Sequence, residues 1–144
     1  YTNMEYGELL HSALINLQCV FKKHLGLVNV SFQKIIALSI IPPDGIAMSP
    51  LSKKLGIDNS TATRLINGME SIGWLRREVS NNDKRVIKVF LTEKGNNIQI
   101  ALEKKIEAIG DEVEKHIDPL TKQDSIEQIS SLNWILLKLS LNDR

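Results

Sequence analysis

Hydroxyl-bearing and basic side chains gather near the middle of the chain, in two groups. The first group follows Asp58, and the second lies further along, at Lys84 and Arg85. Hydroxyl groups can form hydrogen bonds with bases or phosphates, and arginine can bind guanine through two parallel hydrogen bonds. Asparagine can contact adenine or a phosphate. This chemistry suits a nucleic acid. The candidate contacts are Ser60, Thr61, Thr63, Arg64, Asn67, Lys84 and Arg85.

The same region carries an excess of positive charge. Between Ser49 and Gly95 the basic residues outnumber the acidic ones nine to five, although the whole chain has a net charge of only +1. A basic middle between acidic flanks is typical of a nucleic-acid-binding unit inside a larger scaffold. Solvated helix faces produce the same asymmetry, so charge alone does not decide the function.

The first group lies on a predicted helix. Asp58 has the side chain of an N-cap, the helix would run from Asn59 to about Ile72, and Gly73 would close it. A shorter helix is predicted before it, starting at Ser49-Pro50 and ending at Gly56. Two short helices joined through a glycine-containing turn form a helix-turn-helix, and the N-terminal residues of the second helix should approach base edges.

The second group lies at the tip of a predicted β-hairpin. After Gly73 the pattern alternates, with Leu75, Arg77 and Val79 on one face, and a polar turn over 80–84 leads to a β-branched run over 86–91. A helix-turn-helix followed by such a hairpin is a winged helix. The helix fits the major groove of DNA and the basic hairpin reaches the adjacent minor groove or backbone. The predicted fold class is therefore mainly α with a small β-hairpin wing.

Apolar helices are predicted on both sides of this unit. Two lie before it, ending near Leu25 and Ile41, and two long ones follow, beginning near Ile98 and Thr121. The last helix carries Trp134 and other apolar residues on more than one face. Such a helix needs more than one partner, which favours burial against a second subunit.

The composition limits the remaining classes. The chain has 144 residues, 42% of them hydrophobic and 24% charged, which is typical of a globular domain. No apolar run is long enough for a membrane span, and Cys19 is the only cysteine, so we expect a cytoplasmic protein without an internal disulfide. The chain has no nucleophile elbow, phosphate-binding glycine loop, zinc-protease motif or histidine pair with metal-ligand spacing. We therefore expect no enzyme, no metal and no cofactor.

Five segments resemble a known family. The stretches 51–57, 60–65 and 69–75 are similar to the winged helix of the MarR family of bacterial and archaeal regulators. Asp83-Lys84-Arg85 matches the Asp-x-Arg signature of that family's wing, and Leu91–Gly95 matches the segment that leaves the wing. The sequence departs from the family pattern at a few positions, which are Asn59, Asn67 and Trp74.

The resemblance implies an assembly. It implies one MarR-like domain over 1–144, with dimerisation helices over 1–41 and 96–144 and a DNA-binding module over 46–95. Two copies would form a homodimer whose winged helices bind a pseudo-palindromic operator in double-stranded DNA. The implied function is a transcriptional regulator, most often a repressor in this family. The alternative is a winged helix that contacts only proteins and binds no DNA.

The resemblance also implies roles for single residues. Arg85 would enter the minor groove, and Asp83 would orient the wing by pairing with Arg76 or Arg77. Recognition of the operator would fall to a set on the second helix of the helix-turn-helix, namely Ser60, Thr61, Thr63 and Arg64.

The family suggests two kinds of signal. Some members hold a small aromatic effector, and some sense peroxides through one cysteine of the N-terminal helix, the place of Cys19 here. Because Leu17 and Val20 lie beside it on the apolar stripe, a largely buried and inert thiol is the competing expectation.

Overall fold

The computed structural model describes residues 5–141. Residues 1–4 and 142–144, the outer ends of the predicted dimerisation ranges, lie outside the described residues. The chain divides within a long helix into two units, one ending at Ile106 and one beginning at Glu107, and each is described by itself. Within the described part, no helix combines the length and hydropathy that crossing a bilayer requires.

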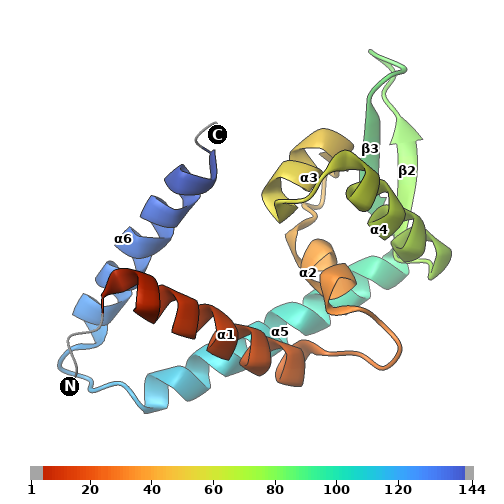
Figure 1. Ribbon diagram of the computed structural model, residues 1–144. Coiled ribbons are helices and arrows are strands. Elements are labelled where there is room, and N and C mark those ends of the chain that lie inside the picture. The colour runs from red at the N-terminus through yellow and green to blue at the C-terminus, as the bar shows by residue number, and fades with distance from the viewer. Residues whose placement is uncertain (1–4, 142–144) are drawn as a thin grey trace. The chain divides into compact units, whose positions relative to one another are not determined.

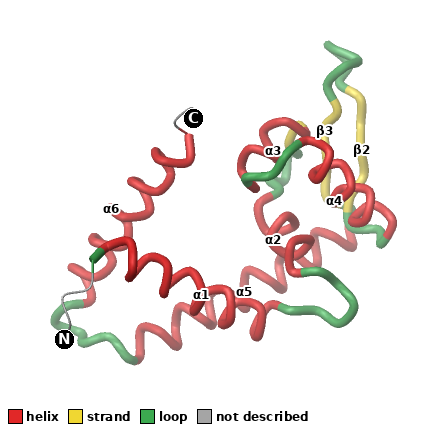
Figure 2. Tube along the Cα trace, in the orientation of Figure 1, coloured by secondary structure: helices red, strands yellow, loops and turns green. Residues whose placement is uncertain are grey.

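The fold is mainly helical with one small sheet, which confirms the predicted fold class (Figures 1 and 2). Glycines and prolines in the sequence mark most of the boundaries between elements. In chain order the elements are α1 (Tyr6–Leu25), α2 (Phe32–Ile40), β1 (Ile46–Ala47), α3 (Met48–Leu55), α4 (Asn59–Ser71), β2 (Leu75–Val79), β3 (Ile87–Leu91), α5 (Glu93–Lys115) and α6 (Lys122–Leu141).

The sheet has three antiparallel strands in the order β1-β3-β2. The predicted hairpin is β2 and β3, paired from Leu75 with Leu91 to Val79 with Ile87. The third strand, β1, in which Ile46 pairs with Val89, was not predicted from the sequence. A two-residue strand is too short to show any alternation of its own. It fixes the chain entering α3 to the hairpin, which extends beyond α3 and α4 (Figure 1).

The helix-turn-helix is held by its turn. Gly56 ends α3 with φ at +67°, a left-handed conformation that favours glycine, as predicted. Asp58 caps α4, also as predicted, and its side chain accepts a hydrogen bond from the backbone N–H of Thr61 at 2.7 Å. The predicted cap of α3 was wrong, because α3 starts at Met48 after Ala47, which gives no side-chain cap. The adjoining β1 fixes the chain at this end instead.

One core joins the helix-turn-helix to the sheet and α5. Its side chains are at most 3% exposed and come from α2, α3, α4, β2, β3 and α5, and from the residues directly after α2 and before β2. The members are Ile35, Leu38, Ile41, Leu51, Ala62, Ile66, Met69, Trp74, Leu75, Val89 and Leu102. Burying apolar area on this scale is the main force that holds α4 against the hairpin.

The start of α5 packs directly on the backbone of Trp74. A β-carbon at Gly95 would lie 2.1 Å from the Trp74 carbonyl oxygen, so only glycine fits there. That oxygen accepts a hydrogen bond from the Thr92 N–H at 3.0 Å, and the Thr92 hydroxyl accepts one from the Gly95 N–H at 3.1 Å. Lys94 donates to the Ile72 carbonyl at the end of α4 at 2.9 Å. The end of α4, both ends of the hairpin and the start of α5 are therefore joined at one place.

A buried glutamine joins α5 to the end of α2. Gln99 is 7% exposed, and its Nε2 donates to the carbonyl oxygens of Leu38 and Ile41, both at 2.8 Å. In a continuing helix the Leu38 carbonyl would accept from residue 42, but Pro42 has no N–H. The amide of Gln99 supplies a donor in its place.

Two helices keep much of their apolar surface exposed. None of the residues of α6 is buried, and Trp134 and Leu139 are 57% and 64% exposed. On α1, Leu9, Leu17 and Val20 of the predicted apolar stripe are also exposed. A single chain leaves these faces in contact with water.

Replacing Gln99 with leucine should destabilise the fold. The substitution removes the amide donor from two carbonyl oxygens, and Leu38 keeps only the long bond of 3.4 Å from the Ile41 N–H. We expect the free energy of unfolding to fall by about 1–3 kcal/mol. Urea denaturation followed by circular dichroism measures the change. Gln33→Leu, at an exposed position of α2, is the matched control and should change stability by less than about 0.5 kcal/mol. Equal effects of the two substitutions would contradict this role of Gln99.

Candidate nucleic-acid interface

The N-terminal turns of α4 present polar side chains to solvent. Ser60, Thr63 and Arg64 are exposed, and Thr61 is partly exposed. The Ser60 hydroxyl donates to Asp58 Oδ1 at 2.9 Å, and the Thr63 hydroxyl donates to the Asn59 carbonyl at 2.8 Å. Each hydroxyl oxygen still has lone pairs that can accept. Their contacts with DNA stay predictions, and the surface they occupy is open.

Asp58 places a negative charge where the dipole of α4 favours one. The hydrogen bond from the Thr61 backbone N–H lowers the pKa of Asp58, and the hydroxyls of Thr61 and Ser60 lower it further. The carboxylate is therefore charged at neutral pH and fixes the first turn of α4. A phosphate at this end of the helix would have to approach beside Asp58, through the exposed hydroxyls and Arg64.

The wing tip is basic and exposed. The side chain of Arg85 is 92% exposed, and Lys84 is exposed beside it. The predicted pairing of Asp83 with Arg76 or Arg77 was wrong, since Asp83 Oδ1 accepts from the backbone N–H of Arg85 at 3.0 Å and from its Nε at 3.3 Å. Asp83 shapes the tight turn of the tip and holds the base of the Arg85 side chain.

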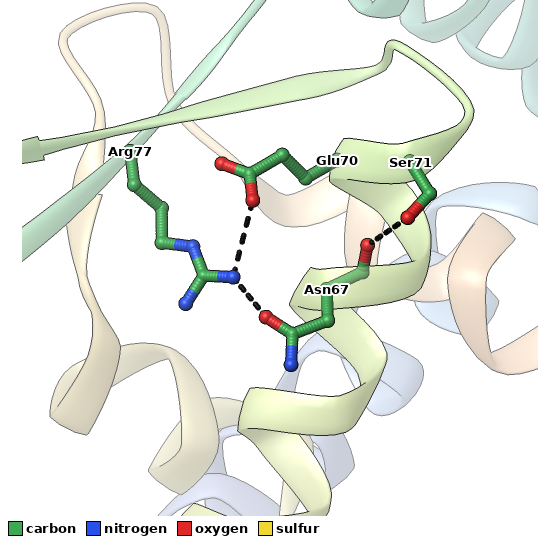
Figure 3. A network of polar contacts seen from close by, with 4 residues as sticks. All are labelled: Asn67, Glu70, Ser71 and Arg77. Atoms are coloured by element: carbon green, nitrogen blue, oxygen red, sulfur yellow. Dashed lines mark hydrogen bonds and ion pairs between the residues drawn. The ribbon is translucent and has the colours of Figure 1, made fainter.

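The two arginines of β2 point to opposite faces of the hairpin. Arg76 pairs with Glu78 on the same strand and lies over the ring of Phe90, 4.6 Å from its centroid. Arg77 faces α4, where its Nη2 donates to Asn67 Oδ1 and to Glu70 Oε1, the latter at 3.1 Å (Figure 3). The oxygen of Asn67, a predicted DNA contact, is thus already bonded within the protein.

A hollow of about 460 Å³ lies between the start of α4 and the hairpin. Asn59 and Thr63 of α4 line it together with Arg77 and Arg85. The structure therefore brings Thr63 of the first predicted group and Arg85 of the second around one concave surface. Lys84 is not among the residues that line this hollow.

Sequence reasoning missed two polar links that position this surface. Ser52 is buried, and its hydroxyl lies 2.9 Å from Asn59 Oδ1, so it ties α3 to the first residue of α4. Lys88 of β3 donates to the Asp44 carbonyl at 3.3 Å. A serine within a helical segment and a lysine within a strand are ordinary surface residues in a sequence, so no signal identifies these contacts.

Cys19 is exposed on α1, so the expectation of a largely buried thiol was wrong. The apolar stripe beside it is exposed as well and gives it no cover within one chain. Among residues 5–141, no three histidine, cysteine, aspartate or glutamate side chains gather in a way that would hold a metal ion.

The helix-turn-helix, the hairpin and β1 together define a winged helix. The model of the MarR family matches residues 43–87, which run from the loop before β1 to the start of β3. Over this segment the chain is similar to the MarR family, in agreement with the resemblance seen in the sequence.

Relatives with curated names are transcriptional regulators. The chain is 33% identical over 87 residues to the transcriptional repressor MprA of Escherichia coli strain K12, covering 60% of this chain and 49% of MprA. It therefore spans about half the length of that relative. The HTH-type transcriptional regulator SarZ of Staphylococcus haemolyticus is 29% identical over 115 residues, which cover 80% of this chain and 73% of SarZ.

A solved structure shares the fold over most of the chain. FabT of Streptococcus pneumoniae, crystallised in complex with DNA, superposes with a TM-score of 0.79 and covers 92% of this chain and 96% of its own. The two sequences are 22% identical, so this likeness concerns the fold.

The cap of α4 should make stability depend on acid pH. Because the pKa of Asp58 is lower in the folded state, its charged form stabilises the fold above the ordinary pKa near 3.8, and this contribution is lost as the pH falls through that value and then through the lowered one. Asp58→Asn keeps an acceptor but removes the titration. We expect wild type to exceed this variant in unfolding free energy at pH 7 and to lose that advantage toward pH 3, measured by urea denaturation. A difference that stays constant from pH 7 to pH 3 would contradict the assignment.

Proposed function

We propose that the chain is a sequence-specific regulator of transcription that binds double-stranded DNA as a homodimer, most simply as a repressor, and that it is not an enzyme. One observation carries the proposal. The exposed first turns of α4 and the basic wing border the same hollow, and Arg77 and Arg85 both line it. A helix beside a basic hairpin fits the major groove and the groove or backbone next to it.

The charges and hydroxyls divide between two tasks. Arg64, near the start of α4, has the side chain that reads guanine in the major groove, with Ser60, Thr61 and Thr63 in reach of bases or phosphates. Arg85 and Lys84 at the wing tip suit the negative potential of a narrow minor groove. The curated names of MprA and SarZ, and the DNA bound to FabT, support this assignment.

The exposed apolar faces support the homodimer. A water-soluble chain rarely leaves residues such as Leu17, Trp134 and Leu139 uncovered together. A second copy would cover α1 and α6 and carry a second winged helix. The two recognition helices would then lie about 34–36 Å apart on DNA, one turn of the duplex.

We propose that a small aromatic effector or an oxidant releases the DNA. Such a signal acts by binding or modifying one arrangement of the two winged helices more strongly than the other. An oxidant would find the thiol of Cys19 accessible in the single chain.

Removing the wing arginine should weaken binding to DNA. Duplexes are first selected by the wild-type protein from a random pool, and the affinity of Arg85→Ala for them is then measured by fluorescence anisotropy at several salt concentrations. We expect a loss of about tenfold or more and a shallower salt dependence, because one cationic contact is removed.

Arg76→Ala is the matched control for Arg85. It removes the same charge from the same hairpin, but on a side chain held by Glu78 and Phe90. We expect it to change the affinity by less than Arg85→Ala does. A wild-type protein that binds no duplex in a salt-dependent way would favour the protein-interaction alternative.

A charge on the apolar face of α6 should separate the subunits. Ile129 is 63% exposed in the single chain, so Ile129→Glu should leave that chain folded and lower the association of two copies. Sedimentation velocity over a concentration series measures the change. The control is Ser131→Glu, which places the same charge on the face shared by Asp124 and Lys138. A wild-type protein that stays monomeric at every concentration would refute the dimer.

A further inference from the structure

The hairpin is fastened to the exposed side of α4 by one guanidinium group. Arg77 lies on β2, and both groups that accept from its Nη2, Asn67 Oδ1 and Glu70 Oε1, lie on α4 (Figure 3). The Arg77 side chain is 26% exposed and that of Glu70 is 42% exposed. The contact is therefore only partly screened by water, and it joins the two elements proposed to meet DNA.

Asn67 already uses the atom that base reading would need. An asparagine reads adenine with two bonds, accepting from N6 through its side-chain oxygen and donating to N7 through its amide nitrogen. One lone pair of that oxygen is bonded to Arg77, and this bond fixes the orientation of the amide group toward β2. The backbone carbonyl of the same residue accepts from the Ser71 hydroxyl at 2.9 Å.

The opposite face of β2 shows the contrast. Arg76 pairs with Glu78 on its own strand and lies over Phe90 of β3, so its contacts stay within the hairpin. Arg77 stands opposite Val89, a fully buried residue of β3, and reaches across to α4. Two neighbouring arginines thus differ in whether they connect the hairpin to the recognition helix.

We propose that Asn67, Glu70 and Arg77 form a clamp that sets the angle of the wing against α4, and that Asn67 positions the two DNA-contacting elements without reading a base. This inference rests on the proposed DNA-binding function. Loss of the clamp changes the distance between Arg85 at the wing tip and Arg64 on α4. It therefore lowers affinity for every duplex alike, whereas loss of a base contact relaxes specificity at one base pair.

The clamp is tested first without DNA. The free energy of unfolding is measured for Asn67→Ala, Arg77→Ala and the double variant. Each substitution is expected to destabilise the fold by some factor in the unfolding equilibrium constant. Because both remove the same contact, the factor for the double variant should be smaller than the product of the two single factors by about twofold or more. In the control cycle, Asn67→Ala with Arg76→Ala, the losses should simply multiply. Multiplying losses in the Asn67–Arg77 cycle would overturn the clamp.

The positioning role is tested with DNA selected by the wild-type protein and with every single base-pair change in it. Asn67→Ala should lower affinity on the order of threefold or more for all of these duplexes, with the ranking among them unchanged. Asn67→Asp keeps the acceptor for Arg77 but has no amide donor, and it should bind more tightly than Asn67→Ala despite its added negative charge.

Two results in the DNA experiment would overturn positioning by Asn67. One is a loss of discrimination confined to one base pair in Asn67→Ala. The other is an affinity of Asn67→Asp at or below that of Asn67→Ala, which would mean that restoring the acceptor for Arg77 does not restore DNA binding. If the wild-type protein selects no duplex, the proposed function fails, and the unfolding cycle still decides whether the clamp exists.

Discussion

The backbones of Trp74 and Gly95 approach each other so closely that no side chain could stand between them. Around this contact, Thr92 bonds to the Trp74 carbonyl and Lys94 bonds to the last turn of α4. The helix α4, the hairpin and the long helix α5 are thereby fixed at one point. At its other end α4 is held by the Asp58 cap and by the bond from Ser52 to Asn59. Held at both ends, α4 is suited to act as a rigid element on which small hydroxyl groups can be presented accurately.

Local signals in the sequence predicted most of the fold. Asp58 and Gly56 were identified correctly because a cap and a left-handed turn each need few residue types. The start of α3 was misplaced because Ser49-Pro50 fits the rule for a helix start. In the structure, β1 pairs with β3 through Ile46, and α3 begins directly after β1, at Met48. That pairing joins residues far apart in the chain, and periodicity carries no information about such contacts.

The sequence predicted where the candidate site lies better than it predicted which side chains pair with one another there. The sequence located the exposed hydroxyls of α4 and the basic wing tip, because residue type and predicted element were enough for that. It did not locate the partners of Asp83 or Arg77, since a charged side chain in a hairpin has several oppositely charged neighbours within reach. The choice depends on which face of the strand meets α4. That is a property of the packed structure.

The amide of Gln99 serves a carbonyl that a proline has left without its usual donor. Pro42 ends α2, and the amide of Gln99 donates to carbonyl oxygens at that end. The two residues therefore act together, although the winged helix lies between them in the sequence. In a related chain with another residue in place of the proline, that carbonyl could regain a backbone donor. The amide of Gln99 would then be needed only by the Ile41 carbonyl. Among descendants of this sequence, substitutions at positions 42 and 99 should therefore tend to occur together.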